Sequence, residues 1–230
     1  DDISFELKAG EILGISGVLG SGRTSLAKAL FGLVAPDQGS ICLSGENIPL
    51  GNPIAATRAG IGYVPEDRLT EGLFLTQSII RNVSVGRFDH HHRSGGFLDL
   101  ASLVDEARGW IERLRIKAPD HEAEVKSLSG GNQQRVALAR WLSQTPRVLV
   151  LNGPSVGVDV GSTWVSIWDR FGVLRGPFGV CLVSMLRSGS DSGLRFPRDQ
   201  ISRPLGPNFA LLLDPMLTPC WPHVGGSRAS

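Results

Sequence analysis

The sequence predicts an α/β fold in which short apolar strands alternate with amphipathic helices. The first observation is the alternation itself, which runs over residues 1–162 of the 230-residue chain. The second is the composition, because 41% hydrophobic and 20% charged residues suit a packed core rather than a disordered chain. The third is that glycine-rich segments stand where predicted strands turn into helices.

The N-terminal part of the pattern is one strand followed by one helix. An apolar run predicts a strand over Glu11–Ser16. Residues Thr24–Phe31 place Leu26 and Leu30 on one helical face, which predicts a helix buried on one side. Gly32 suits the C-terminal end of that helix.

The remaining elements continue the alternation. Short apolar runs predict strands over Ser40–Leu43 and Gly62–Val64. Amphipathic spacing predicts helices over Leu103–Leu114 and Asn132–Leu142. Val148–Leu151 is an unbroken apolar run, which is typical of a strand buried on both faces of a sheet. Together these elements predict an α/β sheet with helical insertions.

Charge and hydropathy exclude several classes of protein. The formal net charge is +1, so no overall field favours nucleic acid as a partner. No apolar run approaches the roughly 18 residues of a membrane span. Cys42, Cys181 and Cys220 have no metal-like spacing and imply no disulfide framework. We therefore expect a cytosolic globular protein, incomplete at its ends.

Gly17–Thr24 has the spacing of a phosphate loop, with Arg23 at the usual lysine position. The segment follows a predicted strand and opens a predicted helix, which is the context that the motif needs. Its backbone N–H groups would converge on phosphate oxygens, and the helix N-terminus adds positive potential. Arg23 would add a permanent cation, and the Thr24 hydroxyl would bind Mg²⁺. The alternative is an ordinary strand–helix turn.

Two further segments lie at comparable positions. In Leu128–Arg135, Ser129 could cap the following helix, or the glycines could leave the helix N-terminus open to an anion. Val148–Pro154 is a buried strand that ends in polar residues, at the edge where α/β sheets bind ligands. Asn152 alone would be an ordinary turn residue.

In order and spacing, these three segments resemble the ATP-binding domain of ABC transporters. Gly62–Arg68, the following residues 71–73 and Gly157–Gly161 are similar to the second ATP-binding half of ribose-, galactoside- and xylose-type sugar importers. The resemblance covers about residues 1–162. It implies an ABC-type P-loop NTPase fold, with a helical signature subdomain over about residues 75–142, incomplete at both ends.

The resemblance implies a role for each matching residue. The nucleotide phosphates would be held by Gly17, Gly20, Ser21, Gly22, Arg23, Thr24 and Ser25. Glu66 stands where the family's loop glutamine senses Mg²⁺ and the transmembrane partner. The ATP of an opposing domain would be contacted by the signature residues Ser129, Gly130, Gly131 and Gln133. Asp159 would lie in the loop that joins the two sites.

The chain departs from the family pattern at the end of the third segment. Asn152-Gly153 stands where a hydrolysing member has Asp-Glu. Asn152 keeps an acceptor oxygen but lacks the charge that holds the magnesium shell, and Gly153 has no side chain to activate water. Loss of a general base costs typically about 10²–10⁴-fold in rate. We therefore expect weak or absent hydrolysis at the chain's own site, and no confident catalytic residue.

The composition changes after Ser162. Residues 163–230 contain no Lys or Glu and hold half of the fourteen prolines, which predicts little regular structure. Two interpretations stay open: an Arg- and Pro-rich extension, or a segment foreign to the ancestral fold. We expect a divergent, poorly ordered tail.

Three functions remain open at this point. The resemblance implies an ATP-driven subunit of a monosaccharide importer, with ATP and Mg²⁺ as cofactors, on the cytoplasmic face of the inner membrane. Its implied partners are a second nucleotide-binding domain, transmembrane permease subunits and, indirectly, a sugar-binding protein, with no nucleic acid. The alternatives are a non-hydrolysing structural or nucleotide-binding partner domain, and a non-functional truncated remnant.

Overall fold

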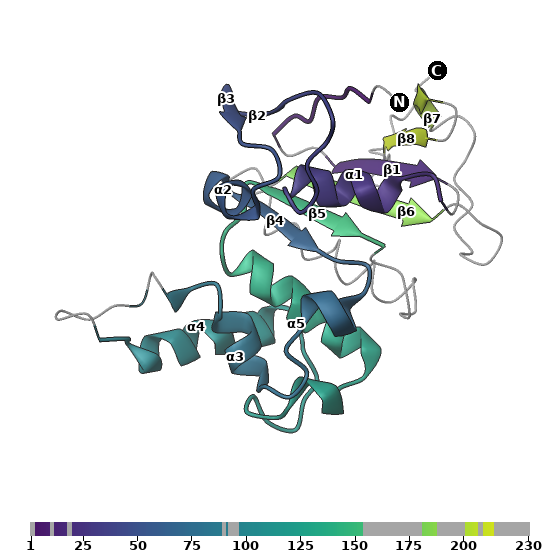
Figure 1. Cartoon of the computed structure of the whole chain (residues 1–230). Coiled ribbons are helices and arrows are strands. Elements are labelled where there is room, and N and C mark those ends of the chain that lie inside the picture. The colour runs from purple at the N-terminus through teal and green to yellow at the C-terminus, as the bar shows by residue number, and fades with distance from the viewer. Residues whose placement is uncertain are drawn as a thin grey trace, which may run out of the picture.

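A six-stranded sheet crosses the molecule in the order β4-β5-β6-β1-β8-β7 (Figure 1). The computed structural model describes residues 3–9, 12–17, 20–88, 91, 97–153, 181–187, 201–206 and 209–213. The strands of the sheet are β1 (Ile12–Gly17), β4 (Ile61–Val64), β5 (Val148–Asn152), β6 (Cys181–Arg187), β7 (Ile201–Gly206) and β8 (Phe209–Leu213). A separate hairpin is formed by β2 (Ile41–Leu43) and β3 (Glu46–Ile48).

The first four strands of the sheet are parallel. β5 pairs with both β4 and β6, and β6 pairs with β1. The remaining two strands, β8 and β7, continue the sheet in antiparallel pairs. Because β4, β5, β6 and β1 run in one direction, the segments that follow them leave at one edge of the sheet. The phosphate loop, Glu66 and Gly153 lie at this edge, after β1, β4 and β5, whereas the signature residues lie in the helical layer.

Helices cover both faces of this sheet (Figure 1). They are α1 (Arg23–Leu30), α2 (Pro53–Ala59), α3 (Ile79–Ser84), α4 (Leu100–Arg113) and α5 (Gly130–Leu142). Two short turns of helix, η1 (Arg68–Gly72) and η3 (Val125–Ser127), connect them. α1 and α2 lie on one side of the sheet, and α3, α4 and α5 form a separate helical layer on the other.

The alternation of side chains along β4 and β5 divides the core in two. Ile61 and Tyr63 of β4, with Val150 of β5, pack into a cluster with α1, α2 and the hairpin. Leu149 and Leu151, which flank Val150 in β5, point to the other face and pack into the cluster of the helical layer. β5 is therefore buried on both faces, as its unbroken apolar sequence predicts.

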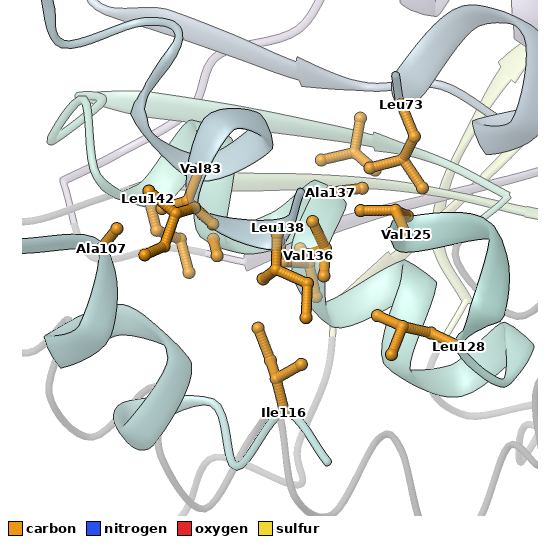
Figure 2. Packing of buried hydrophobic residues seen from close by; sticks show 14 of the residues in the cluster. Leu73, Val83, Ala107, Ile116, Val125, Leu128, Val136, Ala137, Leu138 and Leu142 are labelled. Carbon is orange, nitrogen blue, oxygen red and sulfur yellow. The ribbon is translucent and has the colours of Figure 1, made fainter. Parts of the chain in front are cut away.

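The helical layer is held mainly by the apolar face of α5. Figure 2 shows Val136, Ala137, Leu138 and Leu142 of this helix packed among residues from the neighbouring segments. Leu138 is 1% exposed, and complete burial of such a side chain contributes about 1.5–3 kcal/mol. The packing therefore fixes the position of the N-terminus of α5, where the signature residues lie.

The strands after residue 163 differ from the expectation of little regular structure. β6, β7 and β8 all belong to the main sheet, and β6 and β8 pair with either side of β1. Short apolar runs allow this pairing, and Pro204 is tolerated because β7 is an edge strand with register shifts. The predicted domain boundary at residue 162 lies outside the described residues.

Candidate functional site

The carboxyl edge of the parallel strands brings three of the sequence motifs together. The phosphate loop follows β1, Glu66 follows β4 and Gly153 follows β5. Ligands of open α/β sheets bind at this edge, because the connecting loops leave room there. Gly17 is the last residue of β1, and Ser25 is an exposed residue of α1.

In the described part of the phosphate loop, residues 20–24, the backbone turns at two glycines before α1 begins. Gly20 and Gly22 have φ values of 81° and 87°, in the left-handed region that favours glycine. Gly22 is the N-cap residue of α1 and has no side chain to bond the first N–H groups of the helix. Those N–H groups can therefore serve an anion. The Ser21 hydroxyl oxygen is buried and has no hydrogen-bond partner within the described part of the chain.

Arg23 is the first residue of α1, and its side chain is only 4% exposed. Nε and Nη1 of its guanidinium are buried, and arginine is a permanently cationic side chain in proteins. The next residue, Thr24, donates its hydroxyl hydrogen bond to Oε2 of Glu66 over 3.2 Å. The Thr24 hydroxyl, which the sequence predicts to bind Mg²⁺, is thus hydrogen-bonded to Glu66 in the loop after β4.

Gly153 lies directly beside Glu66. A Cβ atom at residue 153 would be 2.9 Å from Cγ of Glu66, closer than real Cβ contacts, and 3.2 Å from Cδ, which is a tight contact. The φ of Gly153 is +58°, which also disfavours other residues. The backbone therefore favours glycine here, and any other residue would require the Glu66 side chain to shift.

Asn152 is almost completely buried, with 1% of its surface exposed. Its Nδ2 donates to the Tyr63 hydroxyl over 3.4 Å, while its Oδ1 has no hydrogen-bond partner among the described residues. Burial raises the pKa of Tyr63, and the bond from Asn152 partly opposes this shift. Tyr63 was not foreseen as a site residue, because its only sequence signal is its position near the end of a strand.

The oxygen atoms at this edge that could coordinate a cation fit a magnesium-bound nucleotide. They are the Thr24 hydroxyl, the Glu66 carboxylate and the Asn152 amide oxygen, and Mg²⁺ prefers oxygen ligands. The orphaned oxygens of Ser21 and Asn152 are the observation that favours a polar ligand. The described residues contain no group of three or more His, Cys, Asp or Glu residues that could hold a metal alone.

The signature residues lie at the N-terminus of α5, in the helical layer. Ser129 is the exposed N-cap residue, and its backbone oxygen accepts from the Gln133 N–H over 2.9 Å. Its side chain makes no capping bond, although its hydroxyl accepts from Asn132. Gly130 and Gly131 form the first turn, so no bulky side chain covers it. The Gln133 side chain is buried and donates to the Val125 carbonyl over 3.3 Å.

A buried polar network connects α5 to the segment that follows Glu66. The Arg140 guanidinium donates to the Gly72 carbonyl over 2.7 Å, and to the backbone and side-chain oxygens of Asn82. It also lies 4.7 Å from the centre of the Phe74 ring. Burial lowers the pKa of Arg140 to about 10, which leaves it charged at neutral pH. This network joins residues that are far apart in the sequence, so only the tertiary structure reveals it. The predicted inter-site residue Asp159 lies outside the described residues.

Fold and site together define a P-loop nucleotide-binding domain with a helical signature layer. The ABC transporter family matches residues 1–156, and the chain belongs to this family. The match includes every described motif from the phosphate loop to Gly153.

Several curated relatives are similar over the same part of the chain. It is 46% identical over 162 residues to the ribose import ATP-binding protein RbsA of Jannaschia sp. and to that of Chromobacterium violaceum. It is 44% identical over 164 residues to the ribose import ATP-binding protein RbsA of Lactococcus lactis subsp. cremoris. These matches cover 69–70% of this chain. The chain spans only 31–32% of the length of these relatives.

Solved structures establish the same fold. A dimeric ATP-binding cassette in a post-hydrolysis state, bound to ADP and Pi, matches with a TM-score of 0.67 and 21% identity. The match covers 80% of this chain and 78% of that one. A nucleotide-free ATP-binding cassette of an ABC transporter matches with a TM-score of 0.65 and 22% identity, covering 81% and 74%. The chain therefore has the ABC ATPase fold. Within its described part, no helix is long and apolar enough to span a membrane.

Proposed function

We propose that this chain is the second ATP-binding half of an ABC-type monosaccharide importer, with an impaired catalytic site of its own. The observation that carries the proposal is the meeting of the phosphate loop, Glu66 and residues 152–153 at one sheet edge. The names of the relatives support ribose or a related sugar as the transported class. In this proposal residues 1–162 form the nucleotide-binding domain, with a helical subdomain over about residues 75–142.

The chain's own site binds magnesium-ATP but turns it over slowly or not at all. Its first helical turn and Arg23 contact the phosphates, and Thr24 contributes the hydroxyl for Mg²⁺. Asn152 and Gly153 offer no carboxylate to the attacking water. These two residues also favour the second candidate, a partner domain that binds nucleotide without hydrolysing it.

The signature end of α5 serves the site of an opposing domain. It offers an exposed helix N-terminus flanked by glycines, which suits contact with a γ-phosphate. Ser129 and the backbone of Gly130 and Gly131 make this contact in the proposal. Gln133 joins them only if its bond to Val125 opens on assembly. Asp159 belongs to the loop between the two sites.

The permease subunits dock beside the Glu66 loop, at the cytoplasmic face of the inner membrane. A pocket of about 530 Å³, lined by residues such as Phe31, Pro65 and Trp141, supports this assignment. Leu33 and Val34 in its lining are 48% and 46% exposed. A partner helix would cover this apolar surface. Sugar recognition then resides in the permease and an associated binding protein, and nucleic acid has no role.

Nucleotide binding is the direct test of the proposal. Calorimetric titration with magnesium-ATP is expected to show binding that Arg23→Gln weakens about tenfold or more, because a charge-assisted contact to phosphate is lost. Arg58→Gln, on the exposed end of α2, is the matched control and should leave binding unchanged. Unaltered affinity in a folded Arg23→Gln variant would contradict the proposed site.

The signature role is tested in the transporter reconstituted with its permease and an active partner half. Ser129→Arg should abolish the partner's ATP turnover, because a bulky side chain would block the N-terminus of α5. Ser40→Arg changes an exposed serine outside the proposed interface and is the control. Turnover that survives Ser129→Arg would remove the signature from the proposal and leave only the nucleotide-binding role.

A further inference from the structure

Ser129 is an N-cap residue whose side chain does not cap its helix. Serine is preferred at this position because its hydroxyl oxygen usually accepts a hydrogen bond from the second or third N–H of the helix. In α5 that bond is missing, although Ser129 has the extended backbone of an ordinary cap residue, with φ −61° and ψ 154°. Its oxygen accepts instead from Nδ2 of Asn132 over 3.1 Å. A side-chain amide of α5 therefore takes the place of the backbone N–H groups at this oxygen.

Two other donors fix the orientation of the Asn132 amide. Its Oδ1 accepts from the backbone N–H of Lys117 over 3.0 Å and from Nη1 of Arg135 over 3.1 Å. Neither group can accept a hydrogen bond, so an amide NH₂ in place of the oxygen would face two N–H groups. Arg135 also donates to the carbonyl of Arg115 over 3.2 Å, which holds it beside the turn after α4. Nδ2 must therefore face Ser129, and the Ser129 oxygen must accept.

This arrangement keeps the Ser129 hydroxyl proton available to a ligand. A hydroxyl has one proton to donate and two lone pairs with which to accept. The bond from Asn132 occupies a lone pair and not the proton, and the Ser129 residue is exposed. The first N–H groups of α5 also stay free of a side-chain cap. Both kinds of donor suit the oxygens of a phosphate.

We propose that Asn132 is a positioning residue of the signature, which keeps Ser129 from capping α5. The Ser129 hydroxyl and the first N–H groups of the helix then both remain donors for the γ-phosphate of the opposing domain's ATP. This inference rests on the proposed function of the signature, and it adds a residue to which the sequence pattern assigned no role. Asn132 acts through Ser129 and not by its own contact with the nucleotide.

Amide hydrogen exchange tests this geometry without nucleotide or partner. In Asn132→Ala the Ser129 oxygen is released and can cap the helix. Protection of the second and third helical N–H groups should then rise about fivefold, the factor that an N-cap bond is worth. Asn132→Ala combined with Ser129→Ala has no oxygen to form a cap, so its protection should equal that of the unaltered chain. Equal protection in the folded Asn132→Ala variant and the unaltered chain would overturn the proposal.

ATP turnover at the partner's site tests the chemistry, in the transporter reconstituted with its permease and an active partner half. Asn132→Ala should lower kcat/KM about tenfold, because the bond from Ser129 to a charged phosphate is lost. In a Ser129→Ala background the same substitution should change kcat/KM by less than about twofold, since the hydroxyl through which it acts is absent. A residue that only stabilised the turn after α4 would lower kcat/KM equally in both backgrounds, and that result would overturn the proposal.

Asn132→Asp repeats the test with the anchoring bonds in place. One aspartate oxygen still accepts from Lys117 and Arg135, while the other accepts the Ser129 proton and so removes it from the phosphate. kcat/KM should again fall about tenfold or more, and unchanged turnover would overturn the role of Asn132. Asn47→Asp adds the same charge on the exposed part of β3 and should leave turnover unchanged.

Failure of this inference differs from failure of the proposed function. If Ser129→Arg abolishes the partner's turnover while both Asn132 variants leave it unchanged, the signature serves the partner and only the role of Asn132 is overturned. If Ser129→Arg leaves the partner's turnover intact, the proposed function of the signature fails, and the role of Asn132 fails with it.

Discussion

In the part of the chain that the structure describes, buried polar groups are mostly hydrogen-bonded in the helical layer, but two buried oxygens lack partners at the carboxyl edge of the parallel strands. In the helical layer, Asn82 is fully buried, and Arg140, Phe74 and Ser78 satisfy its amide. At the sheet edge, the buried oxygens of Ser21 and Asn152 have no hydrogen-bond partner within the described residues. The Ser84 hydroxyl is the exception in the helical layer.

This difference indicates that the buried polar groups of the helical layer stabilise the fold, whereas those at the sheet edge are suited to bind a ligand. A satisfied network rigidifies the layer, so that the signature end of α5 and the segment after Glu66 keep a common position. An orphaned buried oxygen costs stability until a ligand or water bonds to it. The comparison can be tested by four substitutions of polar residues.

Arg140→Met should have the largest effect on stability. The substitution keeps much of the packing but removes the donors to Gly72 and Asn82, and leaves their oxygens buried. We expect the free energy of unfolding to fall by about 2–4 kcal/mol, measured by urea denaturation. Arg108→Met on the exposed face of α4 should cost about 0.5 kcal/mol or less. A neutral Arg140→Met would show that the network does not hold the helical layer.

Asn152→Asp should have the next largest effect, and its magnitude depends on pH. A carboxylate in this buried position pays for desolvation, so stability at pH 7 should fall by about 1–3 kcal/mol in the absence of nucleotide. Because burial favours the protonated acid, the loss should be smaller at pH 5. Asn47→Asp in the exposed part of β3 should show no such pH dependence. Increased stability of Asn152→Asp at pH 7 without Mg²⁺ would contradict a desolvation cost for a charge at this buried position.

Tyr63 offers a direct view of the sheet edge, because it is the chain's single tyrosine. Burial raises its pKa above 10, so absorbance titration should detect ionisation at a higher pH in the folded protein than after denaturation. The folded state retains a proton that the unfolded chain has lost, so this stabilisation is fully present below pH 10. It is lost as pH rises through the folded pKa. Tyr63→Phe should cost about 0.5–1.5 kcal/mol by removing the partner of Asn152.

Asp67→Asn should have the smallest effect of the four changes. Bonds from the Thr70 hydroxyl, and then from the Thr70 and Leu69 backbone, hold the pKa of the exposed Asp67 below its usual value. Its stabilising contribution is therefore present above about pH 4 and disappears as pH falls through the folded pKa. Comparison of the acid unfolding profiles of Asp67→Asn and the unaltered chain checks this. A larger loss at pH 7 than Arg140→Met causes would reverse the order proposed here.

Phe5 is the one aromatic residue among residues 1–16, upstream of the phosphate loop. Phe5 is partly buried and packs against the core cluster of α1 and the hairpin. This packing favours a core role for Phe5 over a stacking role at the nucleotide. If the phosphate contacts dominate binding to this chain, ATP and GTP should bind with similar affinity.

Local sequence patterns determined much of the fold and identified the phosphate loop. Periodicity located α1, α4 and α5 and the buried strand β5 to within a few residues, because amphipathic spacing and apolar runs are local properties. Short elements such as β3, α2 and α3 were not foreseen, since seven residues or fewer carry little periodic signal. Val180–Ser184 was considered as a strand and overlaps β6 (Cys181–Arg187). β7 and β8 were missed because pairing of β8 with β1 and of β7 with β8, rather than local composition, decides them.

Only the tertiary structure decided how the predicted site residues relate to one another. The sequence placed Thr24, Glu66 and Gly153 in three separate motifs, and it indicated that acids were missing from the last of them. The parallel order of the strands brings these motifs to one edge, where Glu66 contacts both of the other residues. Such contacts join residues that are 42 or more positions apart, so they depend on strand pairing and packing. Local sequence patterns therefore cannot predict them.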